Sequence, residues 1–522
     1  MFALRSTSLL LLSSLLLCAC EVPPLQVTSQ PRKEIKNAPG QLPRIPAADP
    51  AAAEVPQGYK VEAVVTDLVY PSCAEQDPAG NLYVAEAGYV YGDRAAPARV
   101  WQIAKNGDMR IVADQLNGPI TGLLWYENQL YITHKGKVSI LESTGNVRDI
   151  VTDLPSLGDH FNNELAVGPD GKLYFGQGTA TNSGVVGVDN FVFGWLGEHP
   201  DFHDRPAHDI KVTGPEFVTL DPIILTAKEP ALVRTGPFNA FGQGAVKGGV
   251  VKGQTKANGT ILRMNPDGSN LEVFAWGLRN PYGIAWTQQG RLFAADNGYD
   301  DRGSRPVANA PDVIWEIAQN GWYGWPDYVA GEPITDAKFQ APKKNALKFI
   351  LQDHPPVQQP FIKLPVEAAV TQLDISRSDK FGFEGQLFVG EVGDMSPVVG
   401  PRHPVGYQVA RIDPLTRKAE TFFHTRQDAL GPAENHLEYV QTAGPKRIVG
   451  VRFSPNGDAL YVADIGAIAI FPSPTPAIQA FPGTGVIWRI TKEGTPVSGP
   501  PAGLSILKGR GQQPTVRQAS AH

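Results

Sequence analysis

One histidine stands out as a candidate base. His160 occurs in GDHFNNELAVGPDGKLYFGQG, residues 158–178, just before an alternating apolar stretch that predicts a strand and a turn. Its side chain is therefore expected on a loop or at a strand edge. A neutral imidazole accepts a proton near neutral pH, so His160 is a candidate general base. A lone histidine in such a position is more often structural or exposed, and its surroundings must decide between the two interpretations.

A second candidate segment is WGLRNPYGIAW, residues 276–286. Pro281 disfavours a helix at the residue before it, so Arg279 and Asn280 are expected in a tight turn with aromatic neighbours. A guanidinium offers a planar pair of donors that matches a carboxylate, which indicates an anion site. The alternative is an arginine that packs over an aromatic ring as part of the scaffold.

A third segment, residues 294–328, concentrates oxygen ligands. It carries Asp296, Asp300 and Asp312 among glycines and prolines. Oxygen ligands on an irregular loop suit calcium, and Asp296 and Asp312 are the candidate ligands. A solvated turn is the alternative interpretation of the same residues.

Two recurring patterns predict the elements that position these residues. The first is a turn followed by a Leu-aromatic pair, and its copies are DPAGNLYVAEAG (77–88), YENQLYITHKG (126–136), GPDGKLYFGQG (168–178), TQQGRLFAADNG (287–298), FEGQLFVGEVG (383–393) and SPNGDALYVADIG (454–466). The second is an alternating apolar strand that runs into a turn, and its copies are RVWQIAKNG (99–107), VSILESTG (138–145), TILRMNPDG (260–268), VIWEIAQNG (313–321), QVARIDPLT (408–416) and VIWRITKEG (486–494).

Six copies of each pattern predict an all-β fold, a six-bladed β-propeller with inserted loops. The largest insertion is expected near residues 180–258, where two successive copies of the first pattern are far apart. Propellers bind ligands at one mouth of the central channel, on loops between strands. A β-sandwich with a second domain is the alternative architecture.

The composition and the two ends of the chain bound its class. The 522 residues carry a formal net charge of -6, which gives no signal for nucleic acid as a partner. Arg5 and a short apolar core over 9–17 predict an export signal, and the LCAC that ends at Cys20 resembles a bacterial lipobox. Ordinary signal cleavage near Ala19 is the alternative. Once Cys20 is lipidated, Cys73 is left alone and no internal disulfide can form.

The expected organisation follows from these signals. Residues 1–19 form a lipoprotein signal peptide, 20–55 a Pro/Ala-rich flexible linker, 56–495 the propeller and 496–522 a flexible tail. The exported protein is then held by its lipid on a bacterial membrane and faces the periplasm or the cell exterior. In a Gram-negative host, the residue after Cys20 indicates the outer membrane.

Most of residues 56–495 resembles the glucose/sorbosone dehydrogenase family, the soluble sugar dehydrogenases that use pyrroloquinoline quinone (PQQ). GLRNPYG is close to a specific signature of that family, and NGWYGWPDY and VRFSPNGDALYVAD are further matches in the right order. The resemblance implies that His160 is the catalytic base and that Arg279, Asn280 and Arg447 contact the cofactor. It also implies calcium as a second cofactor, with Asp296 and Asp312 as its ligands.

The implied reaction is oxidation of an aldose-type sugar at its anomeric hydroxyl to a lactone. Hydride passes to PQQ, the proton passes to His160, and the electrons leave to an external acceptor. The chain departs from the family at Val449, where a second arginine is usual, and in 384–395, which has no counterpart of a cofactor-binding lysine. In the calcium loop it has Asp296-Asn297-Gly298 and Asp312-Val313 where Glu-His-Gly and Asp-Glu are usual, so that the family's glutamate is lost. A non-catalytic cell-surface propeller that binds glycans or proteins, and a metal-dependent lactonase-like hydrolase, remain as alternatives.

Overall fold

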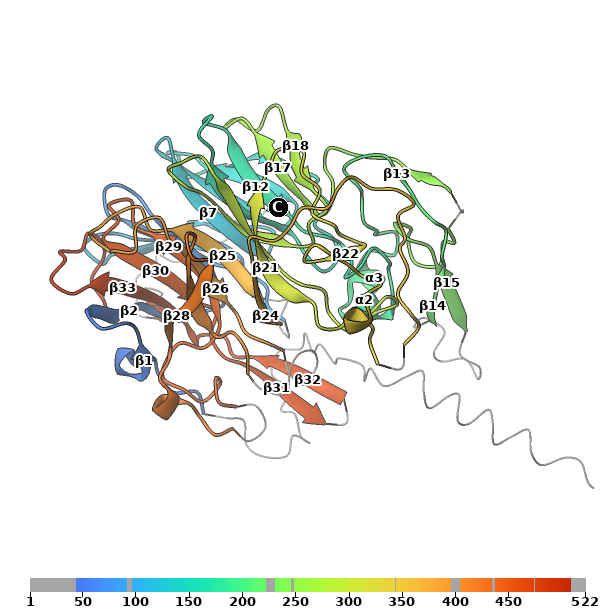
Figure 1. Ribbon diagram of the computed structural model, residues 1–522. Helices are drawn as coiled ribbons and strands as arrows, with labels where there is room; N and C mark the ends of the chain where they lie inside the picture. The colour runs from blue at the N-terminus through green and yellow to red at the C-terminus, as the bar shows by residue number, and fades with distance from the viewer. Residues whose placement is uncertain are drawn as a thin grey trace, which may run out of the picture.

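Six antiparallel sheets form the body of the protein (Figure 1). The computed structural model describes residues 44–91, 96–221, 231–245, 248–342, 344–395, 404–433, 437–473 and 475–507. Blade one is β3 (Pro71–Gln76), β4 (Leu82–Glu86), β5 (Arg99–Ile103) and β6 (Met109–Ala113); blade two is β7 (Ile120–Tyr126), β8 (Gln129–His134), β9 (Lys137–Leu141) and β10 (Val147–Val151). Blade three is β11 (Asn162–Val167), β12 (Leu173–Gln177), β17 (Thr260–Met264) and β18 (Glu272–Trp276).

The other three blades follow in chain order. Blade four is β19 (Pro281–Trp286), β20 (Leu292–Asp296), β21 (Pro311–Ile317) and β24 (Ile362–Val366); blade five is β25 (Val370–Ile375), β26 (Leu387–Glu391), β27 (Gln408–Asp413) and β28 (Lys418–Thr425). Blade six is β29 (Ile448–Phe453), β30 (Ala459–Asp464), β33 (Gly485–Lys492) and β2 (Tyr59–Leu68). The N-terminal strand β2 thus completes the last blade and joins the two ends of the chain.

The six blades close into a ring, which confirms the predicted six-bladed β-propeller. The first strands of the blades, β3, β7, β11, β19, β25 and β29, each contact the next one, and β29 contacts β3. The recurring turns come from residues that favour them: Gly171 and Gly290 take φ values of 71° and 76° between the first two strands of blades three and four, a backbone region open to glycine. Apolar side chains fill the space between blades, and Phe381, Phe388 and Phe453 are typical of this core.

The chain direction gives the ring two different ends. Each blade starts at its inner strand and runs outward through antiparallel neighbours, so the fourth strand finishes at the end of the ring where the next inner strand begins. All six inner strands therefore start at one end of the ring. Residues directly before them gather around that mouth of the channel.

The folded part extends beyond both predicted boundaries. β1 (Ala53–Glu54), which falls in the predicted linker, pairs with β28, and β34 (Leu504–Ser505), which falls in the predicted tail, pairs in parallel with β2. The physical reason is apolar burial, because Ile506 is fully buried in the cluster that β2 and blade one share. The predicted signal peptide, Cys20 and most of the linker lie outside the described residues. Among the described residues, the helices are too short or too polar to span a bilayer.

The predicted insertion lies between β12 and β17 of blade three. It contains α2 (Val188–Val192), α3 (Trp195–Glu198) and the strand pairs β13 (Ile210–Lys211) with β16 (Val250–Val251) and β14 (Phe217–Leu220) with β15 (Leu232–Thr235). The remaining elements are β22 (Tyr328–Val329), β23 (Glu332–Pro333), β31 (Ile468–Ser473), β32 (Thr475–Ala480), η1 (Pro50–Ala52), η2 (Ala337–Phe339) and η3 (Gln427–Ala429). In Figure 1 the hairpins β14–β15 and β31–β32 project away from the blades.

Candidate active site

The predicted site residues occupy equivalent places in three blades. His160 lies two residues before β11, Asn280 directly before β19, and Arg447 directly before β29. Because all inner strands start at one end of the ring, the structure brings His160, the Arg279–Asn280 pair and Arg447 to the same mouth. Sequence order alone does not give this convergence.

A buried carboxylate holds the Arg279–Asn280 turn in place. Asp296, the last residue of β20, accepts hydrogen bonds from the backbone N–H of Arg279 at 3.2 Å and of Asn280 at 2.6 Å. The indole Nε1 of Trp315 on β21 donates to the other carboxylate oxygen at 3.0 Å. The turn is thus fixed by the two neighbouring strands of its own blade.

The same arrangement recurs before β29. Asp464 on β30 accepts hydrogen bonds from the backbone N–H of Lys446 at 2.8 Å and of Arg447 at 2.9 Å, and from the indole Nε1 of Trp488 at 3.3 Å. We call this set of a strand-end carboxylate, the preceding turn and a tryptophan the carboxylate–indole clamp. The turns that carry Arg279 and Arg447 are therefore positioned by the same arrangement.

His160 has a defined tautomer. Its ring Nδ1 lies 2.9 Å from the carbonyl oxygen of Thr179 and 3.2 Å from the hydroxyl oxygen of Thr179. A carbonyl only accepts, and the hydroxyl donates elsewhere, to the carbonyl of Thr181 at 2.8 Å, so Nδ1 must carry the proton. The lone pair of the neutral ring is therefore on Nε2.

The surroundings of His160 keep it neutral. Burial, followed by the charges of Arg279 and Arg302, holds the pKa of His160 well below its usual range, and the opposing charge of Asp300 does not offset them. A neutral imidazole with its lone pair on Nε2 can accept a proton at neutral pH. The half-buried His160 is thus unprotonated and available as a proton acceptor at neutral pH.

An ion-pair network links His160 to the arginine turn. The Arg302 guanidinium pairs with Asp159 at 2.8 Å, with Asp189 at 2.6 Å and with Asp300 at 2.8 Å, and Asp300 also pairs with Arg279 at 2.8 Å. Although burial alone would raise the pKa of Asp300, Arg279 and Arg302 lower it to about 2. Sequence reasoning placed Asp300 only among possible oxygen ligands and missed Arg302 entirely.

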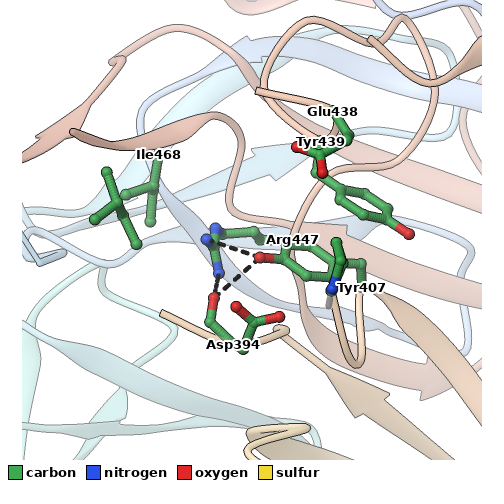
Figure 2. Close-up of a pocket in the computed structure, with 8 residues that line it drawn as sticks. Asp394, Tyr407, Glu438, Tyr439, Arg447 and Ile468 are labelled. Atoms are coloured by element: carbon green, nitrogen blue, oxygen red, sulfur yellow. Dashed lines mark hydrogen bonds between the residues drawn. The ribbon is translucent and has the colours of Figure 1, made fainter. Parts of the chain in front are cut away.

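Arg447 lines a pocket on the side of blades five and six. Its Nη1 donates to the carbonyl oxygens of Val392, Gly393 and Asp394 at 3.3, 3.1 and 3.1 Å, and its Nη2 donates to the Tyr407 hydroxyl at 3.2 Å. Figure 2 shows the guanidinium beside the Tyr407 ring. The pocket has a volume of about 290 Å³, which includes the space open to solvent at its mouth. It is lined by Asp394, Pro404, Tyr407, Glu438, Tyr439, Arg447, Ile468 and Ile470.

The two arginines differ in how their charges are balanced. Arg279 is 3% exposed and pairs with Asp300, whereas Arg447 is 4% exposed and bonds, among the described residues, only to neutral oxygens. A buried cation without a carboxylate partner fits an anionic ligand. Among the predicted site residues, Arg447 is therefore the cation that is not already neutralised by a carboxylate of the described residues.

The two aspartates predicted to bind metal have other partners. Both oxygens of Asp296 serve the carboxylate–indole clamp, while Asp312 accepts from the backbone N–H of Gly298 at 2.7 Å and of Val370 at 3.0 Å. Burial raises the pKa of each aspartate to about 6. In the described ranges no three His, Cys, Asp or Glu side chains are grouped to hold a metal. These residues therefore do not fit calcium.

Comparison with known sequences confirms the predicted resemblance over part of the chain. Residues 243–399 match the Glucose / Sorbosone dehydrogenase family, and this range contains Arg279, Asn280, Asp296 and Asp312. A curated relative, quinoprotein glucose dehydrogenase B from Acinetobacter calcoaceticus, is 23% identical over 208 residues, which cover 39% of this chain and 34% of the relative. The match therefore spans about a third of the length of that relative. These findings support a sugar dehydrogenase family of the PQQ type.

Solved structures share the fold. The holo form of the pyranose dehydrogenase PQQ domain from Coprinopsis cinerea aligns with a TM-score of 0.51 at 14% identity, over 86% of this chain and 98% of that domain. The Trichoderma reesei protein of carbohydrate-active enzyme family AA12, in an iodide structure, aligns with a TM-score of 0.50 at 15% identity, over 86% of this chain and all of that one (100%). At these identities the likeness shows the propeller architecture.

Proposed function

We propose that this chain is an oxidoreductase that oxidises an aldose-type sugar at its anomeric hydroxyl, with PQQ as the hydride acceptor. The observation that carries the proposal is the neutral His160, with its lone pair on Nε2, at the mouth that also receives Arg279 and Arg447. The family match over 243–399 adds independent support.

Three residues would hold the cofactor. Bound PQQ would supply a planar quinone that accepts hydride and three carboxylates that need cations. Arg447 would pair with one of these carboxylates, because its own contacts leave its charge without an anionic partner in the described residues. Arg279 and Asn280 would form the rim at blade four, where the clamp of Asp296 fixes their backbone.

His160 would remove the proton of the anomeric hydroxyl. The contact of Nδ1 with Thr179 keeps the ring in one orientation and keeps Nε2 unprotonated. The depressed pKa ensures that the base is in its working form at neutral pH. A positioned general base of this kind contributes about 10²–10⁴ to a rate.

The insertion would limit water at the base. Phe161, the neighbour of His160, packs edge-on against Trp195 of α3 with ring centroids 5.9 Å apart, in a cluster that includes Val186 and Leu196. The carboxylate of Asp204 anchors the start of this segment by accepting from the backbone N–H of Ala180 at 2.6 Å. Apolar cover of this type strengthens electrostatic interactions beneath it.

Reconstitution tests the proposal. The purified protein is titrated with PQQ, unbound cofactor is removed, and reduction of an artificial dye is followed with a panel of aldoses. We expect saturable cofactor binding and aldose-dependent dye reduction. A protein that binds PQQ but shows no turnover with any aldose, or that does not bind PQQ, contradicts the proposal. Saturable glycan binding without turnover would favour the non-catalytic alternative.

We further propose that the chain is exported and held to the membrane by a lipid on Cys20. The support is the apolar segment that ends in LCAC. Expression of the full chain and of Cys20→Ser in a bacterial host, followed by fractionation and mass spectrometry of the N-terminal peptide, tests this. Lipid on Cys20 and release of the variant from the membrane are expected; equal fractionation of both proteins contradicts the anchor.

A further inference from the structure

Arg302 has an unusual set of partners for a loop arginine. It lies between β20 and β21 and its side chain is only 12% exposed. Its guanidinium pairs with three carboxylates, those of Asp159, Asp189 and Asp300, and its carbon Cζ lies 5.0 Å from the centroid of the Phe193 ring. Burial of a cation costs desolvation free energy, which the contacts with the three carboxylates and the ring must offset. The loss of any of these contacts leaves part of that cost uncompensated.

The partners come from three separate parts of the site. Asp159 is the residue before His160; Asp189 lies in α2 of the insertion, and Phe193 directly follows that helix. Asp300 is the partner of Arg279. Arg302 therefore joins the loop that carries His160, the insertion, and the aspartate that pairs with Arg279.

A second set of contacts joins the same parts. The side chain of Asn190 donates to Asp159 at 3.1 Å, and the amide oxygen of Asn182 accepts from both Arg279 Nη2 and the backbone N–H of Asp300, each at 3.0 Å. Polar groups around Arg302 thus tie the insertion to the site, in addition to the apolar contact of Phe161 with Trp195. Loss of Arg302 would leave three carboxylates close together with Arg279 as the remaining paired cation.

We propose that Arg302 is a positioning residue for His160, which ties the segment 187–198 of the insertion to Asp159, the residue before the base, and so keeps the surroundings of the imidazole in place; the proposal rests on the function proposed for His160. The guanidinium acts through its neighbours and does not itself exchange a proton with substrate. Substitution of Arg302 therefore changes the environment of the base, while His160 keeps its own backbone contacts with Thr179.

The charges that face His160 determine how its pKa should change when Arg302 is removed. Burial, Arg279 and Arg302 lower its pKa, and Asp300 raises it. Removal of Arg302 takes away one of the two cations, leaves Asp300 less neutralised, and admits water as the insertion loosens. All three changes favour the imidazolium ion, so the pKa of His160 rises.

The test measures His160 directly in the folded protein. Ring NMR signals of histidine-labelled protein are titrated in the parent, Arg302→Met and Arg302→Lys, with His160→Gln used to assign the signal. Hydrogen exchange of segment 187–198 is followed in parallel. Arg291→Met, which removes a half-exposed arginine paired with Glu316 on the same blade, is the matched control.

We expect the pKa of His160 to rise by about one unit or more in Arg302→Met, with at least about tenfold faster exchange in 187–198. Arg302→Lys, which keeps the charge, should restore most of the pKa and less of the protection. The control should match the parent. An unchanged pKa of His160 in folded Arg302→Met overturns the proposal.

A second variant guards against a failure of Arg302→Met to fold. Asp189→Asn removes the ion pair between the insertion and Arg302 and leaves the Phe193 contact in place. Asp209→Asn changes an exposed aspartate of the same insertion that is paired with Lys252, and is its control. Faster exchange of 187–198 is expected in the first variant alone, and equal exchange in both argues against the proposal. None of these measurements uses sugar turnover. An inactive parent therefore counts against the proposed function, whereas an unmoved His160 pKa counts against the role of Arg302.

Discussion

The ring Nδ1 of His160 lies 2.9 Å from the carbonyl oxygen of Thr179, and this contact decides which nitrogen can act as a base. Thr179 is the second residue after β12, the second strand of blade three. The main chain of blade three therefore sets the orientation of the His160 ring. The neutral Nε2 at the mouth is therefore a property of the local fold.

This geometry predicts the pH dependence of turnover. The base works only when unprotonated, and its pKa lies well below 6.5 in the folded protein. As pH falls, activity should be lost only through this lowered pKa, so kcat/KM should be constant from pH 6.5 upward until another group titrates. The measurement is kcat/KM against pH with a fixed aldose and dye. An acid limb centred at or above pH 6.5 would contradict a neutral buried imidazole.

We predict that substitution of Arg447 lowers the affinity for PQQ. Its guanidinium is buried against neutral oxygens and lacks an anionic partner among the residues described. A charge-assisted contact of this type is worth about 1.5–3 kcal/mol, so Arg447→Met should weaken PQQ binding about 10- to 100-fold. The Kd is measured by fluorescence titration, and Arg426→Met, an exposed arginine on the blade-five side, should leave it unchanged. Equal Kd values for Arg447→Met and the parent would remove Arg447 from the site.

We predict that substitution of Asp296 lowers the stability of the protein whether or not calcium is present. It accepts two backbone N–H groups and the Trp315 indole, and an asparagine in its place would direct one N–H₂ group at these donors. Asp296→Asn should lower the free energy of unfolding by about 1–3 kcal/mol, measured by urea denaturation. Calcium or a chelator should leave the parent's Tm without cofactor unchanged. A calcium-dependent Tm that disappears in the variant would restore the metal assignment.

We predict that Glu164 makes the free energy of unfolding depend on pH. It is fully buried on β11 and pairs with Arg452 at 2.9 Å, and burial raises its pKa to about 8 from the 4.5 of a free carboxyl. Because the folded state holds the proton more tightly, the unfolding free energy should fall as pH rises from 4.5 to 8, by about 2–4 kcal/mol from this group.

Glu164→Gln isolates that contribution, since the amide does not titrate. Urea denaturation of both proteins at pH 5, 6, 7 and 8 should show the parent losing stability relative to the variant as pH rises. Groups that do not share Arg452 with Glu164, such as His134, titrate equally in both and cancel in the difference. A difference that is independent of pH would mean that Glu164 is ionised throughout this range.

The propeller was predictable because its signal is local. Each blade repeats its own turn and its own alternating strand, and six copies of each leave few other architectures. The ends of the fold were harder, because the ordering of β1 and β34 depends on apolar contacts with distant strands.

The candidate site was only partly predictable. The sequence pointed to His160, Arg279 and Arg447, but Arg302 draws its role from contacts with residues more than a hundred positions away. Asp296 was assigned to a metal because an aspartate that accepts N–H groups looks the same in sequence as an oxygen ligand. A signal was nevertheless present: the two recurring patterns also place Glu86 with Trp101 and Asp464 with Trp488, and both pairs are hydrogen-bonded.

The central claim is that His160 removes the sugar's proton in a PQQ-loaded site, and a single-turnover experiment tests it most directly. Protein saturated with PQQ is mixed with excess aldose in the absence of an electron acceptor, and the absorbance of the bound cofactor is followed in the parent and in His160→Asn. We expect reduction in the parent and a rate at least about 100-fold lower in the variant, with the same amount of cofactor bound. No aldose-dependent reduction in the parent, or equal rates in the two proteins, would contradict the claim.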